Sequence, residues 1–104
     1  MNRQLDIKRE YSDEVDKMRK NRVEVSFHKY GPARINFGEG LVKAKSSALM
    51  CIKKYEETKN KEYLLDAMNY LMFEFMYPSM EGVFFKATDS SESAGKDGVS
   101  INGI

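Results

Sequence analysis

The chain has 104 residues, 41% of them apolar and 32% charged, with a formal net charge of +1. This composition is typical of one globular domain spanning residues 1–104 and excludes a disordered chain. The balanced charge argues against nucleic acid as a partner. Cys51 is the only cysteine. An internal disulfide is therefore impossible, which fits a reducing compartment.

The chain also lacks the apolar runs that membrane insertion or secretion require. No run reaches the roughly 18 residues of a membrane span. The N-terminus MNRQLDIKRE is charged and has no signal-peptide core. We therefore expect a cytoplasmic protein without a membrane partner.

The first predicted element is a short N-terminal helix that begins after Ser12. The serine hydroxyl is a suitable N-cap, and three acidic residues follow at 13, 14 and 16, where the helix dipole favours them. The sequence VEVSF then alternates apolar and polar residues, which predicts a β segment near 23–27. Glycines and Pro32 mark the loop that follows.

Two stronger helices are predicted next, at about 40–57 and 61–77. Apolar residues recur at three- and four-residue steps in both, Asn60 is placed to cap the second, and Pro78 ends it. The link EETKNK is short, so the two helices should form an antiparallel hairpin. The predicted fold class is mainly α, with this hairpin, the shorter N-terminal helix and minor β segments.

The helix at 61–77 is apolar on nearly every side. One stripe consists of Leu64, Met68, Leu71 and Phe75. A helix of this kind is either central or shared with a second subunit. Because a chain of this size buries only about two-thirds of its unfolded surface, we expect a homo-oligomer.

The closing segment predicts two further β segments, near 83–87 and 98–102, with a polar loop between them. If this segment folds back, Phe84 or Phe85 should be buried. The loop offers hydroxyls, free N–H groups and a cation, as an anion-binding nest does, although an ordinary polar hairpin loop has the same composition. The candidate ligand-binding residues are Asn69, Phe85, Thr88, Asp89, Ser90, Ser91, Ser93 and Lys96.

A metal site is the alternative chemistry. Glu62 and Asp66 are four residues apart and share a helix face, as oxygen ligands of Mg²⁺ would. The facing helix offers only Glu56 and Glu57 at its far end, and a solvated acidic stripe has the same pattern. No set of catalytic residues can be assembled, so we expect no cofactor and lean against an enzyme, with Mg²⁺ only under the alternative.

Residues 58–95 resemble a family of small proteins found in phages and prophages. The signature is a DA-N-Y-M-EFM-P helix followed by an aromatic residue and TDS-ES-G. Its elements here are Asp66, Ala67, Asn69, Tyr70, Met72, Glu74, Phe75, Met76 and Pro78, then Phe85, Thr88, Asp89, Ser90, Glu92, Ser93 and Gly95. The resemblance implies a phage origin, and hence the cytoplasm of a bacterial host, rather than an activity.

The order of elements is also similar to the MazG-like all-α NTP pyrophosphohydrolases. Those enzymes carry an EExxE cluster on the first long helix, where this chain has AKSSALMCIKKYEE, and ExxD on the next, where Glu62 and Asp66 are one residue too far apart. We therefore expect a phage accessory protein that acts by binding, against host defence. It would sequester a nucleotide-type immune signal or block a host immune protein. The alternative is a divergent metal-dependent pyrophosphohydrolase.

Overall fold

The computed structural model describes residues 3–89, 91–92 and 94, and over this part of the chain the protein is mainly helical. The predicted fold class is therefore confirmed. Among the described residues, none of the helices combines the length and apolar character needed to cross a membrane. The elements in chain order are α1 (Ile7–Glu10), α2 (Asp13–Tyr30), α3 (Ala33–Asn36), α4 (Ala44–Thr58) and α5 (Glu62–Met76).

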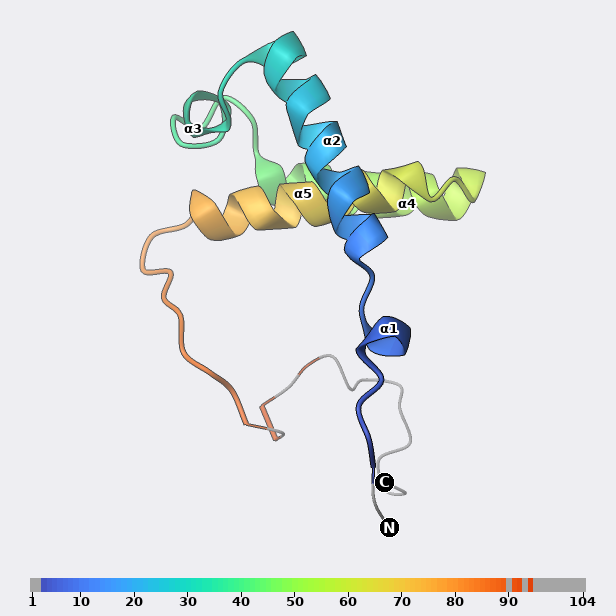
Figure 1. Cartoon of the computed structure of the whole chain (residues 1–104). Helices are drawn as coiled ribbons and strands as arrows, with labels where there is room; N and C mark the ends of the chain where they lie inside the picture. The colour runs from blue at the N-terminus through green and yellow to red at the C-terminus, as the bar shows by residue number, and fades with distance from the viewer. Residues whose placement is uncertain (1–2, 90, 93, 95–104) are drawn as a thin grey trace.

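The predicted hairpin is formed by α4 and α5, which lie side by side and antiparallel (Figure 1). Lys59 ends α4 in a left-handed conformation with φ 63°. The Asn60 side chain then accepts a hydrogen bond from the Glu62 N–H at 3.0 Å. This bond satisfies one of the backbone donors at the start of α5. At the other end, α5 stops two residues before Pro78, as predicted.

Helix α2 begins as predicted but is much longer than predicted. The Ser12 hydroxyl accepts a hydrogen bond from the Val15 N–H at 3.1 Å. The helix then continues for 18 residues to Tyr30, so it is the longest helix described, and the β segment predicted near 23–27 is wrong. Val23, Phe27 and Tyr30 are also spaced by four and three residues, which is helical spacing.

Gly31 ends α2 because the backbone turns sharply there. Its φ of 85° lies in the left-handed region that glycine adopts without strain. The chain then forms α3 and returns to α4 past Gly38, where an added Cβ would lie 2.2 Å from the Arg34 carbonyl oxygen. The two glycines therefore allow the compact loop that carries α3 back over the hairpin (Figure 1).

The core lies where α2 crosses α5 and where α5 packs on α4. Its buried apolar residues in the described part of the chain are Ala44, Ala48, Leu65, Ala67 and Phe73. The Phe37 ring, just after α3, stacks on Phe73 with 4.6 Å between ring centroids. Three of these five buried apolar residues are alanines, so the core is small for a chain of this length.

The segment after α5 differs from the prediction. Residues 83–87 form no strand, and Phe84 and Phe85 are 81% and 80% exposed, so the predicted strand and the predicted burial are both wrong. Glu74 fixes only the start of the segment, by accepting hydrogen bonds from the Ser79 N–H at 2.8 Å and the Ser79 hydroxyl at 2.9 Å. The strand predicted near 98–102 lies outside the described residues.

The cap at Ser12 gives a direct test of what stabilises α2. Ser12→Ala should lower the free energy of unfolding by about 1 kcal/mol, because the Val15 N–H loses its partner. Thermal unfolding followed by circular dichroism would measure this. Ser12→Asn, which keeps a capping oxygen, should stay close to the original stability. Equal losses in both variants would contradict the capping role.

Candidate functional site

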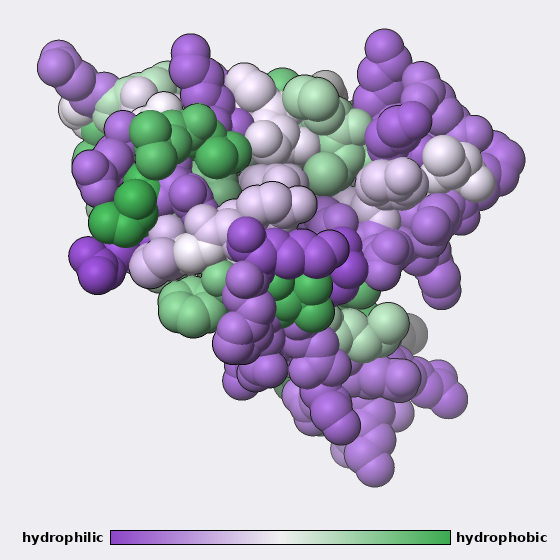
Figure 2. Space-filling model, turned by 90° about the horizontal axis from the view of Figure 1, so that it is seen from above, coloured by the Kyte–Doolittle hydropathy of each residue, from purple (hydrophilic) through white to green (hydrophobic). Residues whose placement is uncertain are grey.

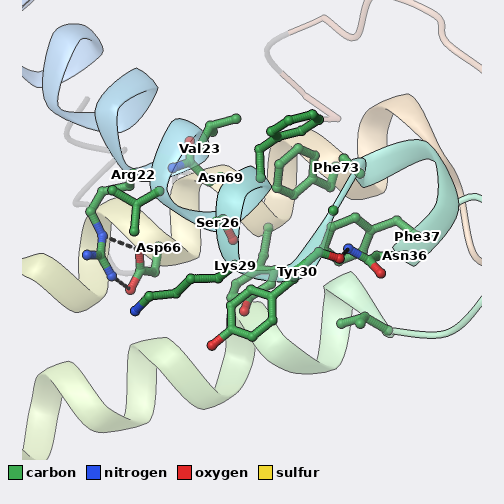
Figure 3. A pocket seen from close by; sticks show the side chains of 16 residues that line it. Arg22, Val23, Ser26, Lys29, Tyr30, Asn36, Phe37, Asp66, Asn69 and Phe73 are labelled. Carbon is green, nitrogen blue, oxygen red and sulfur yellow. Dashed lines mark hydrogen bonds and ion pairs between the residues drawn. The ribbon is translucent and has the colours of Figure 1, made fainter.

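A pocket of about 370 Å³ lies between α2, the α3 loop and α5 (Figure 3). Arg22 and Asp66 lie at one end of it, and Phe73 and Asn36 lie at the other. Its walls combine aromatic rings with cationic and amide groups. The residues that line it are Arg22, Val23, Val25, Ser26, Phe27, Lys29, Tyr30, Gly31, Ala33, Asn36, Phe37, Val42, Asp66, Asn69, Tyr70 and Phe73.

Helix geometry places the polar groups of α2 along this pocket. Arg22, Ser26 and Lys29 are spaced by four and three residues, so they project from one face of the helix. The far end of the pocket is fixed by Asn36, whose side-chain N–H donates to the Tyr30 carbonyl oxygen at 3.0 Å. This bond holds α3 close to the end of α2.

Asn69 is the most unusual polar residue of the pocket. It is only 5% exposed, and its side-chain N–H donates to the Arg19 carbonyl oxygen at 3.0 Å. Its side-chain oxygen is buried and accepts no hydrogen bond from the described residues. Leaving such an acceptor unpaired costs about 1–3 kcal/mol. The oxygen has almost no accessible surface, so it is enclosed by protein atoms and does not open onto the pocket.

Arg22 forms an ion-pair cluster with two carboxylates of α5. Its Nε and Nη2 donate to the two Asp66 oxygens at 3.0 and 3.1 Å, and its Nη1 lies 3.3 Å from Glu62 Oε1. The hydrogen bonds to Asp66 raise the pKa of Arg22. This bidentate contact joins α2 to α5 and leaves a guanidinium at one end of the pocket.

These carboxylates are the pair that the sequence offered as metal ligands. In the part of the chain that is described, no three His, Cys, Asp or Glu side chains come together as a metal site. The oxygens of Asp66 instead accept both hydrogen bonds from Arg22. A metal at Glu62 and Asp66 stays a prediction, and it would have to displace the guanidinium.

Tyr70 adds a hydroxyl to the same wall. Burial raises the pKa of its phenol, with smaller contributions from Cys51 and Asp66. The phenol therefore stays protonated at neutral pH and can donate a hydrogen bond. Burial also raises the pKa of the Cys51 thiol, which keeps this cysteine in its less reactive form.

The predicted ligand-binding residues do not form one site. Asn69 lines the pocket, but Phe85, Thr88, Asp89 and Ser91 are exposed and are not among the lining residues. Asp89 instead accepts hydrogen bonds from the side chain and backbone of Ser91 at 2.7 and 2.9 Å, which lower the pKa of its carboxyl group. The remaining predicted residues, Ser90, Ser93 and Lys96, lie outside the described residues.

Sequence reasoning missed most of the pocket because it assigned residues 23–27 to a strand. Read as a helix, that stretch continues the face that carries Arg22 and Lys29, and this signal was present in the spacing. No sequence pattern indicated that Phe37 would line the pocket. It depends on how the loop folds back over α5, which puts Phe37 and Phe73 in contact.

Comparisons with known proteins add no relative. No family model matches the chain, and no curated protein or solved structure matches it.

The contact between Arg22 and Asp66 should be measurable as a coupling free energy between the two side chains in protein unfolding. Asp66→Asn should destabilise the fold by about 1 kcal/mol, a modest figure because both side chains are partly exposed to solvent. In a double-mutant cycle with Arg22→Gln, denaturant unfolding should show that the two losses are not additive. Additive losses would show that the pair contributes nothing to the packing of α2 on α5.

Proposed function

We propose that the chain is a phage accessory protein that binds a small anionic ligand of the nucleotide type and does not cleave it. The ligand would be a signal of the host's defence in the bacterial cytoplasm, which the protein sequesters. The phage-like signature at 58–95 supports the origin. The pocket between α2, α3 and α5 supports the binding mode.

The observation that carries the proposal is a pocket whose walls combine aromatic rings with cationic side chains. Aromatic rings such as Phe27 suit the flat faces of a heterocyclic base. Lys29 is exposed at the same pocket and can pair with a phosphate. The volume of about 370 Å³ is within the range of small-molecule sites.

Three probes separate the parts of this proposal in calorimetric titrations: adenosine 5′-monophosphate, adenosine and inorganic phosphate. The nucleotide should bind most tightly because only it uses both the aromatic wall and the cation. Lys29→Gln should weaken nucleotide binding about tenfold, the value of one charge-assisted hydrogen bond, and leave adenosine binding unchanged. Lys53→Gln is the matched control, since Lys53 is also exposed but lies on α4 and outside the pocket.

Mass spectrometry of the denatured, purified protein would test for a ligand that these probes do not represent. The proposal fails if no small molecule is released and none of the three probes binds at millimolar concentration. Binding of a host protein in that situation would favour the blocking of an immune protein. Mg²⁺-dependent release of pyrophosphate from NTPs, abolished in Asp66→Ala, would favour the pyrophosphohydrolase alternative.

A further inference from the structure

The stretch 32–42, which we call the α3 unit, is hydrogen-bonded to itself rather than to the long helices. The Phe37 N–H donates to the Ala33 carbonyl oxygen at 2.8 Å, and the Val42 N–H donates to the Asn36 carbonyl oxygen at 2.7 Å. Within the described part of the chain, no backbone hydrogen bond joins this stretch to α2, α4 or α5. The α3 unit can therefore move as one body without breaking its own backbone hydrogen bonds.

One loosely packed residue connects the α3 unit to a helix at each end. Gly31 has a φ of 85°, and a Cβ added to it would meet no atom within 4 Å. At the other end, Lys43 is extended and exposed, and its side chain makes no capping hydrogen bond with α4. Packing therefore restricts backbone rotation little at these two positions, and glycine adds conformational freedom of its own at the first.

Burial and polar contacts hold the α3 unit only weakly. None of its residues is fully buried, and Leu41 is 69% exposed. The view from above looks at the side of the molecule where α3 and the end of α2 lie, and it shows apolar patches at the surface (Figure 2). The bond from Asn36 to the Tyr30 carbonyl oxygen is the only side-chain hydrogen bond that the described residues give the unit. Segments with so few buried contacts open at a lower free energy than the core.

The main attachment of the α3 unit to α5 is aromatic. The Phe37 ring is stacked on Phe73, with 4.6 Å between centroids, and it meets the Tyr70 ring edge-on at 6.0 Å. Gly38 lies beside the Tyr77 ring, since a Cβ added there would be 3.5 Å from it. These contacts all lie on one side of the unit's backbone hydrogen bonds, so separating the rings releases the unit from α5.

We propose that the α3 unit docks on α5 and undocks from it as one body while α2, α4 and α5 stay folded, and that the docked unit completes the pocket. The unit supplies four of the lining residues, Ala33, Asn36, Phe37 and Val42. Figure 3 shows Asn36 and Phe37 together at one end of the pocket. Undocking removes this wall, so a molecule that contacts it binds the docked state and shifts the equilibrium toward that state. The docking equilibrium does not depend on the proposed function, whereas the effect of a nucleotide on it does.

Tryptophan fluorescence tests the undocking without any ligand. The chain contains no tryptophan, so Phe37→Trp and Phe73→Trp each place a single fluorophore on one side of the aromatic stack. In a urea titration, the tryptophan emission should change at a lower concentration than the circular dichroism of the helices, because the unit undocks before the helices unfold. Circular dichroism without urea checks that each variant is folded. Coincident transitions in both variants overturn the proposal.

The hydrogen bond of Asn36 gives a second test in the Phe37→Trp background. Asn36→Ala should raise the undocked population about fivefold, the value of one neutral hydrogen bond. It should therefore move the fluorescence transition to lower urea and leave the circular dichroism transition in place. Arg34→Ala is the matched control, since Arg34 is exposed in the same unit and does not line the pocket. Equal shifts of both transitions in Asn36→Ala would contradict separate docking.

Adenosine 5′-monophosphate tests the link between docking and the pocket. Added to the Phe73→Trp and Phe37→Trp variants, the nucleotide should move the fluorescence transition to higher urea, because it binds only while the wall is in place. Nucleotide binding that leaves this transition unchanged would show that the unit does not complete the site. Failure of the nucleotide to bind the original chain contradicts the proposed function instead, and the two urea transitions still decide whether the α3 unit docks separately.

Discussion

The crossing of α2 over α5 is the contact on which the rest of the structure depends. Two groups of interactions hold it: the bidentate pair of Arg22 with Asp66, and the hydrogen bond from Asn69 to the Arg19 carbonyl oxygen. Both connect residues more than 40 positions apart. Without them, α2 would have no fixed position over the hairpin, and one wall of the pocket would be missing.

The same contact involves Asn69, a polar residue that lines the pocket. Asn69 uses its N–H to hold α2, and its oxygen is buried without a partner among the described residues. The docking of α2 therefore depends in part on this one amide side chain. Substitution of Asn69 would disturb the docking of α2, which is why Lys29, an exposed residue of the same pocket, is the better position for a binding experiment.

The parts of the fold that the sequence predicted are those set by local signals. Ser12, Asn60 and Pro78 fix helix ends by hydrogen bonding or by the geometry of proline, and all three act as expected. The segment 23–27 was misassigned to a strand because its apolar residues alternate with polar ones. The same residues are also compatible with a helix. The packing of α2 on α5 decides between the two readings, and that packing is a long-range property. For the same reason, Asn69 could be proposed from the sequence as a candidate, but the pocket residues Asn36 and Phe37 could not.

The arrangement of the contacts has a consequence for the order of folding. The α4–α5 hairpin is built from neighbours in sequence, whereas α2 docks through residue pairs separated by 44 and 50 positions. Local contacts form faster because they close shorter loops. We therefore expect the hairpin to form first and α2 to dock last, and partial unfolding to release α2 before the hairpin opens. A molecule bound in the pocket would then stabilise the docked position of α2, because it can stay bound only while α2 remains docked.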